Sequence, residues 1–340
     1  MKILMDAYGG DHAPLEAIKG AVEYVKDGGK SEICLVGKVD EIKKIMADNN
    51  FSDKNITFLN ATEVITNEES PTEAFKKKPD STINVALNAL KTKEYGAFVS
   101  AGSTGALLTA CVLKVGRIKG VSRPALSTLM PKPDGGLCMF LDCGANADCK
   151  PINLVHFAIM ADVYMRKVCG IKRPKIGLLC NGTEDKKGNE LTHAVFKLLK
   201  QLPSLNFVGN VEGRDILSGV CDVVVADGFS GNCALKAIEG AVNTMLSKLK
   251  ENIMESKSAK LGYLFMKKAF KKTMGELDYR KRGGAVFLGV NGVIAKSHGA
   301  SKATSFKATL FQAEEAVSRN VNEEIFERLQ ADEVKNLVLE

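Results

Sequence analysis

Short apolar runs recur along the chain, and a polar loop that contains glycine follows each of them. The clearest runs are residues 3–5, 97–100, 137–141, 176–180 and 223–226. They do not alternate strictly between apolar and polar residues, which is typical of strands covered on both faces. Helices are predicted at 40–48, 190–201, 234–255 and 310–330. The pattern therefore predicts an α/β fold with a largely parallel sheet and flanking helices.

One helical segment is predicted to leave the sheet. Lysine becomes frequent and strand signals disappear from about residue 251, so we expect a helical excursion at about 234–282. Within residues 259–274, Phe265 and Phe270 belong to an apolar side. The opposite side carries Lys260, Lys267, Lys268, Lys271 and Lys272. Such a helix is typical of a membrane surface or an acidic partner, and packing on a second subunit is an open alternative.

The composition narrows the class of protein. No segment has the roughly 18 uninterrupted apolar residues that a membrane span needs. The first residues reach Asp6 too early for a signal peptide, so we expect a cytoplasmic protein. None of the nine cysteines forms a C-x-x-C pair, which favours reduced, buried thiols over metal sites or disulfides. The formal net charge of +7 is compatible with an acidic partner or surface, and we expect no nucleic-acid partner.

Common catalytic signatures are absent from the sequence. There is no P-loop motif and no G-x-G-x-x-G after the first apolar run, which argues against a nucleotide site. No loop has the G-x-S-x-G spacing of a nucleophile elbow. The four histidines (12, 156, 193 and 298) are far apart and lack metal-ligand spacing. We therefore predict neither a cofactor nor a metal.

Two segments that precede predicted helices are candidate anion sites. The first is 102–105, with Ser103 and Thr104, and the second is 228–232. Unpaired amides and the helix dipole favour an anion at a helix N-terminus. Ordinary capping by the serines is an open alternative. In the second segment the candidates are Gly228, Ser230, Gly231 and Asn232.

The segment 142–150 has the composition of a ligand site rather than of a core. It follows the apolar run 137–141 and contains Gly144, Asn146 and Asp148. Open α/β sheets bind ligands beyond the carboxyl ends of their strands. Because four other polar loops follow apolar runs in the same way, we expect all five to share one cleft.

The loop 181–190 and the pair Asp11-His12 carry the remaining candidate groups. Asn181 and Thr183 can donate to an oxyanion or a phosphate, and Lys186 adds a positive charge. A solvated turn is the alternative for this loop. A neighbouring carboxylate can fix the tautomer of an imidazole, so His12 beside Asp11 is a candidate base. A capping or packing role is equally open for His12.

Taken together, these loops resemble the bacterial acyl-ACP:phosphate acyltransferase family. The first of the matching motifs is MDAYGGDHAP at residues 5–14. The others lie at 100–106, 141–151, 181–190, 209–215, 226–240 and 283–299. The resemblance spans nearly the whole chain in order. It implies a single unit over residues 1–340 with a three-layer α/β/α sandwich, similar to isopropylmalate dehydrogenases and phosphotransacetylases and usually dimeric.

The resemblance implies transfer of a long acyl group from the thioester of acyl carrier protein to inorganic phosphate. The product, acyl phosphate, is used by glycerol-3-phosphate acyltransferase in phospholipid synthesis. Members of the family associate peripherally with the inner face of the membrane. The helix at 259–274 is then expected to meet lipid, carrier protein or a second subunit, with Lys267, Lys268, Lys271, Lys272, Phe265 and Phe270 as contact residues. The basic cluster at 280–282 is a further candidate for the acidic carrier.

Phosphate is already an anionic nucleophile near neutral pH, so direct attack needs no covalent enzyme intermediate. We expect Ser103, Thr104, Lys186 and residues 228–232 to hold phosphate. Asn181 and Thr183 are candidate oxyanion donors, and His12 is the candidate for proton transfer. Substrate contacts are also assigned to Asp11, Gly144, Asn146 and Asp148. Cys143 and Cys149 are expected to be bystanders.

Three other functions fit parts of the sequence. The first is a short-chain phosphotransacetylase that uses a CoA thioester, and the second is a dehydrogenase of the isopropylmalate type. A dehydrogenase requires a divalent metal and a nicotinamide cofactor. The third is a non-catalytic scaffold at the membrane surface, which leaves the polar loops unexplained.

Overall fold

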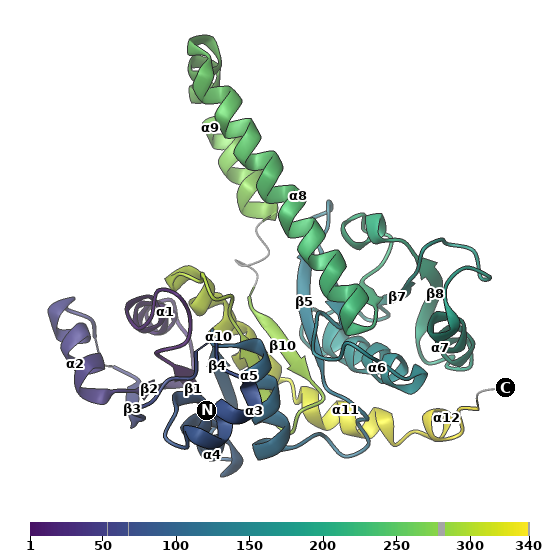
Figure 1. The fold of residues 1–340 in the computed structure, drawn as a ribbon, viewed down its shortest axis with the longest axis horizontal. Coiled ribbons are helices and arrows are strands. Elements are labelled where there is room, and N and C mark those ends of the chain that lie inside the picture. Colours follow the sequence, from purple (N-terminus) through teal and green to yellow (C-terminus); the bar gives the residue numbers. More distant parts are fainter. Residues whose placement is uncertain (53, 67, 278–282, 339–340) are drawn as a thin grey trace.

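The computed structural model describes residues 1–52, 54–66, 68–277 and 283–338. The strands of this part join in one 11-stranded sheet of order β3-β2-β1-β4-β11-β10-β5-β6-β9-β7-β8 (Figure 1). Their bounds are β1 Lys2–Asp6, β2 Glu32–Gly37, β3 Ile56–Asn60, β4 Ala97–Ser100, β5 Ala125–Pro131, β6 Leu137–Leu141, β7 Lys175–Leu179, β8 Asn206–Val211, β9 Val223–Val225, β10 Ala285–Leu288 and β11 Val293–Lys296. The basic cluster at 280–282 lies outside the described residues.

Helices cover both faces of this sheet. They are α1 Leu15–Lys26, α2 Val39–Asp48, α3 Pro71–Lys77, α4 Thr82–Lys91, α5 Thr104–Ala110, α6 Pro151–Lys167, α7 Glu190–Lys200, α8 Gly228–Glu255, α9 Lys257–Leu277, α10 Ala303–Ser318, α11 Val321–Leu329 and α12 Asp332–Lys335. A π-helical segment, Cys111–Val115, extends α5, and a 3₁₀ helix spans Gly213–Leu217.

Successive residues of the central strands enter two different core layers. In β1, Ile3 and Met5 pack in the layer that includes α1, α6 and α10. Leu4 packs in the layer that includes α4 and α5. All three side chains are fully buried. The predicted sandwich and its strands with two buried faces are therefore confirmed.

Most neighbouring strands run parallel, as predicted, but three antiparallel pairs divide the sheet. The strands β3, β2, β1, β4 and β11 run in one direction. The strands β6, β9, β7 and β8 share a second direction. Between them, β11–β10, β10–β5 and β5–β6 are antiparallel, so the second group runs opposite to the first. The carboxyl ends of the two groups consequently lie at opposite edges, and the expectation of five loops at equivalent strand ends is wrong.

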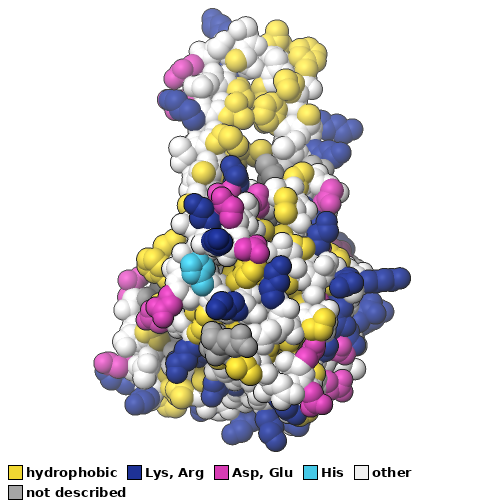
Figure 2. Space-filling model, turned by 90° about the vertical axis from the view of Figure 1, so that its right-hand side faces the viewer, with side chains coloured by type: hydrophobic (Ala, Val, Ile, Leu, Met, Phe, Trp, Pro, Cys, Tyr) yellow, Lys and Arg dark blue, Asp and Glu magenta, His cyan; other side chains and the backbone are white. Residues whose placement is uncertain are grey.

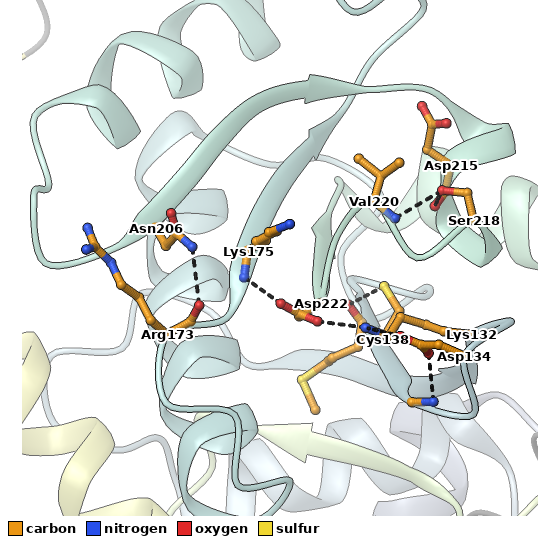
Figure 3. Close-up of polar contacts among 12 residues, drawn as sticks. Lys132, Asp134, Cys138, Arg173, Lys175, Asn206, Asp215, Ser218, Val220 and Asp222 are labelled. Carbon is orange, nitrogen blue, oxygen red and sulfur yellow. Dashed lines mark hydrogen bonds and ion pairs between the residues drawn. The ribbon is translucent and has the colours of Figure 1, made fainter.

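Asp222 ties the second group of strands to the turn between β5 and β6 (Figure 3). One carboxylate oxygen accepts from the Lys132 ammonium at 2.9 Å, and the other accepts from the Lys175 amide at 2.8 Å. The Lys132 and Asp222 side chains are only 9% and 14% exposed. A nearly buried ion pair thus fixes the start of β9 beside β7 and the β5–β6 turn.

Two of the predicted helices have different bounds in the structure. The predicted helix at 310–330 is two helices, because α10 ends at Ser318 and Asn320 adopts a positive φ of 52° before α11 begins. The predicted helix at 234–255 begins earlier, at Gly228. The segment 228–232 is therefore the first turn of α8 and not a loop.

The helices α8 and α9 form a hairpin that projects from the body of the molecule (Figure 1). This confirms a helical excursion after residue 234. Figure 2 shows hydrophobic side chains gathered along the hairpin, with lysine and arginine side chains on its flanks and over the body. Among the described residues of α9, Phe265 is 84% exposed and Leu264 is 65% exposed. The four predicted contact lysines between 267 and 272 are also exposed.

Candidate active site

The buried carboxylate of Asp142 organises the loop that follows β6. Asp142 is 0% exposed. It accepts from the amides of Leu126, Gly144, Ala145 and Asn146 at 2.8–3.2 Å. Burial raises the pKa of this carboxyl, and the bonds from Ala145 and Asn146 oppose that shift. The loop is therefore held by a charge-compensating cage of backbone donors.

The Asn146 side chain belongs to the same cage. It is 8% exposed, and its Nδ2 donates to the Pro124 carbonyl at 2.7 Å and to the Asp142 carboxylate at 2.8 Å. Both donor positions of the amide are thus engaged within the protein. Asp148, by contrast, is exposed. The substrate contacts assigned to Asn146 and Asp148 remain predictions.

The first turn of α8 packs directly on this loop. A Cβ at Gly231 would lie 1.9 Å from the Asp142 carbonyl oxygen, and a Cβ at Gly228 would lie 2.5 Å from the Asn146 carbonyl oxygen. Both glycines therefore permit close backbone approach. The Gly228 amide donates to the Asn146 carbonyl at 2.8 Å, and the Ser230 amide donates to the Asp227 side chain at 2.9 Å. The amides of Gly228 and Ser230 are thus engaged within the protein. In this turn the side chains of Ser230 and Asn232 remain the candidates for contact with a substrate.

A second buried carboxylate organises the opposite half of the molecule. Asp6, 1% exposed, accepts from the amides of Tyr8 and Gly9 at 3.0 and 3.1 Å and from the Ser100 hydroxyl at 2.7 Å. The Ser100 hydroxyl accepts in turn from the Gly102 amide at 3.0 Å. Asp6 therefore joins the loop after β1 to the loop after β4.

The loop after β1 also contacts the loop after β11. The Asp11 amide donates to the Gly299 carbonyl at 2.8 Å. The side chains of Asp11 and His12 are exposed, and within the described part of the chain no hydrogen bond joins them. The role of His12 as a base stays a prediction.

A cavity of about 350 Å³ lies where the two halves meet, over β5, β10 and β11. Three predicted residues line it: Thr104, Gly144 and Asn232. His298 also lines it. Several lining residues were not predicted: Thr128, Lys236, Glu239, Lys296, Ser297 and Ser301. The cavity thus combines hydroxyl groups with two lysines.

The two lysines differ in their surroundings. Lys236 in α8 pairs with Glu239 at 2.7 Å. Lys296, at the end of β11, is partly buried and donates to the Ser297 carbonyl at 3.1 Å. Burial and the charge of Lys236, partly opposed by the charge of Asp11, together lower the pKa of Lys296 to about 8. Lys296 is therefore a poorly compensated cation that faces the cavity.

The loop 181–190 lies outside this set of cavity-lining residues. Asn181, Thr183 and Lys186 are exposed. The loop is held by the Asn210 side chain, which donates to the Glu184 carbonyl at 2.9 Å, and by a 3.1 Å contact between the His193 ring and the Lys186 carbonyl. The catalytic roles assigned to Asn181, Thr183 and Lys186 remain predictions.

Cysteine is poorly suited to act as a nucleophile here. Cys143 lines the cavity, but burial raises the pKa of its thiol well above the ordinary value. Burial likewise raises the pKa of Cys149 to about 11. A thiolate is the reactive form, and both thiols are protonated near neutral pH. In the described ranges, no cluster of three or more His, Cys, Asp or Glu could hold a metal ion.

The fold is that of the phosphotransacetylases. A phosphotransacetylase from Streptococcus pyogenes matches with a TM-score of 0.60 and 19% identity over 94% of each chain. A phosphotransacetylase from Staphylococcus aureus matches with a TM-score of 0.59 and 15% identity, over 93% of this chain and 94% of that one. At these identities the likeness concerns the fold alone.

Sequence relatives define the family. The model of a family described as "Fatty acid synthesis protein" matches residues 1–324. A phosphate acyltransferase of Clostridium novyi is 46% identical over 92% of this chain and 94% of its own length. A phosphate acyltransferase of Dictyoglomus turgidum is 45% identical over 97% of this chain and 98% of its own. The chain belongs to this phosphate acyltransferase family.

Proposed function

We propose that this protein transfers a long-chain acyl group from acyl-ACP to inorganic phosphate. The observation that carries the proposal is the cavity between the two halves of the sheet, which is lined by hydroxyls and lysines. Such a lining suits an anionic substrate. Family membership and the names of the relatives support phosphate as the acyl acceptor.

In this mechanism a phosphate oxygen attacks the thioester carbonyl carbon. A carbon–oxygen bond forms, the carbon–sulfur bond breaks, and the thiolate leaves with the carrier and takes up a proton. Holding phosphate against the thioester can supply about 7–11 kcal/mol of the barrier. Each donor to the developing oxyanion is worth about 3–4 kcal/mol. The protonated, buried Cys143 is consistent with direct attack and no acyl-enzyme.

We further propose that the α8–α9 hairpin associates with the inner face of the membrane from the cytoplasm. Its support is the exposure of Phe265 and Leu264 beside exposed lysines. Within the described residues, none of the helices is long and apolar enough to cross a bilayer. At the membrane, glycerol-3-phosphate acyltransferase would receive the acyl phosphate. The exposed apolar side chains of the hairpin suit a homodimer as well, and its lysines suit the acidic carrier.

The test is incubation of the purified protein with long-chain acyl-ACP, with and without phosphate, while acyl phosphate is measured. The proposal predicts loss of acyl-ACP and appearance of acyl phosphate only when phosphate is present. A parallel reaction with acetyl-CoA distinguishes the short-chain phosphotransacetylase, which turns over acetyl groups well and long acyl groups poorly. A non-catalytic scaffold gives no phosphate-dependent loss of either thioester.

A further inference from the structure

Two polar groups that line the cavity lack the partners their burial requires. Lys296 makes one hydrogen bond from its ammonium, to the Ser297 carbonyl. Among the described residues, no carboxylate lies within ion-pair distance of it. Ser301 is 3% exposed, and its hydroxyl has no hydrogen-bond partner in the part of the chain that the structure describes. Buried polar groups are normally satisfied, so this pair of side chains is unusual.

Some neighbouring polar groups of the cavity are already paired. Lys236 is bonded to Glu239. The hydroxyls of Ser297 and Thr309 contact each other at 2.9 Å. Lys296, which has only one hydrogen bond among the described residues, and the unpartnered Ser301 lie five residues apart, at the end of β11 and in the segment that follows it.

We propose that Lys296 and Ser301 form the subsite that holds the inorganic phosphate. The inference rests on the proposed function, because it assigns the acceptor substrate to one end of the same cavity. A phosphate oxygen accepts from the Lys296 ammonium, and another accepts from the Ser301 hydroxyl. The negative charge of the bound phosphate compensates the positive charge of Lys296.

Phosphate held here faces the rest of the cavity lining. Thr104, Gly144 and Asn232 line the same cavity from the start of α5, the loop after β6 and α8, respectively. The thioester carbonyl is then expected on the side of these three residues. Because Lys296 ends a strand in the centre of the sheet, paired with β4 and β10, the subsite has a rigid base.

The experiment measures phosphate binding directly. Titration calorimetry with inorganic phosphate is performed on the wild-type protein and on the variants Lys296→Met, Ser301→Ala and Lys302→Met. Lys302 is the matched control, since it is exposed and does not line the cavity. Loss of a charged donor is expected to weaken phosphate binding about 10- to 100-fold in Lys296→Met, with a smaller loss in Ser301→Ala and none in Lys302→Met.

Turnover separates this inference from the proposed function. If acyl phosphate is formed, Lys296→Met should raise the KM for phosphate and leave the KM for acyl-ACP unchanged. If the wild-type protein binds phosphate but forms no acyl phosphate, weakened binding in Lys296→Met still supports the subsite, and the proposed function fails alone. Phosphate affinity in folded Lys296→Met equal to that of the wild-type protein would overturn the inference.

Discussion

Replacing Lys296 with methionine should make the protein more stable while it weakens phosphate binding. The structure buries this ammonium in the cavity beside Lys236, without a carboxylate partner among the described residues. Methionine retains most of the volume of the side chain and removes the charge. The variant therefore isolates the cost of keeping a cation in the cavity.

The size of the expected gain in stability follows from the pKa of Lys296. Burial lowers it from 10.5 to about 8, and each pH unit of such a difference corresponds to about 1.36 kcal/mol. Below pH 8 the lysine is charged in both the folded and unfolded states, so the full cost is present. That cost is at most about 3 kcal/mol, because part of the side chain reaches solvent. We expect Lys296→Met to gain about 1–3 kcal/mol at pH 7.

The difference in the free energy of unfolding between the wild-type protein and Lys296→Met should depend on pH. Between pH 8 and 10.5 the unfolded chain keeps the proton of Lys296 and the folded protein loses it. The wild-type protein therefore regains stability as pH rises through this window, and its difference from the variant shrinks. The charges of Lys236 and Asp11 act on Lys296, and the titratable side chains of Glu239 and His298 line the same cavity. The interactions of Lys236 and Asp11 with the Lys296 charge are lost in the variant and therefore form part of the difference in stability.

Urea denaturation of both proteins without phosphate, at several pH values from neutral to about 10, measures this difference. Lys302→Met is the control and should change the free energy of unfolding by less than about 0.5 kcal/mol. A loss of stability in Lys296→Met at neutral pH would refute the reasoning. A difference in the free energy of unfolding between the two proteins that does not change between pH 8 and 10 would also contradict it.

Three further predictions follow from packing and exposure. Asp222→Ala leaves the nearly buried Lys132 without its partner and should lower the free energy of unfolding, measured with urea, by about 3–5 kcal/mol. Asp134→Ala removes a carboxylate that is 67% exposed and should lower it by less than about 0.5 kcal/mol. Gly231→Ala forces a Cβ into the Asp142 carbonyl and should cost about 2–4 kcal/mol and lower activity. Gly240→Ala is its control in the same helix, because a Cβ there would meet open space. This variant should raise the free energy of unfolding by about 0.5–1 kcal/mol. Equal changes in the two glycine variants would contradict the packing argument. Phe265→Glu should weaken flotation with anionic lipid vesicles without changing the melting temperature, and unchanged flotation would remove this residue from the membrane contact.

The strands and layers could be predicted because burial on both faces leaves a direct mark in the sequence. The runs 3–5 and 223–226 are continuous and apolar, and both form inner strands of the sheet. The direction of a strand leaves no such mark. The antiparallel pairs of β5 with β6 and β10 depend on tertiary pairing, so the apolar pattern did not show that the polar loops lie at two edges.

Residues of the site could be predicted from the sequence only where the composition of a segment is typical of a ligand site. Thr104, Gly144 and Asn232 were selected for their small or polar character, and all three line the cavity. Lys296 was missed because a lysine after an apolar run is usually a solvated strand end. A signal was available in the segment Val293–Ala295, whose apolar residues lead directly into lysine, serine and histidine. Gly231 was interpreted as part of an anion site, whereas its contact with Asp142 shows that close packing requires the glycine.

We infer that inorganic phosphate attacks an acyl thioester in the cavity beside Lys296. The most direct measurement is the rate of acyl phosphate formation from long-chain acyl-ACP as phosphate is varied, for the wild-type protein and Lys296→Met. Acyl phosphate formation is expected to depend on phosphate, and Lys296→Met should approach the wild-type rate only at much higher phosphate concentration. Release of free fatty acid without acyl phosphate, or identical phosphate dependence in the two proteins, would contradict it.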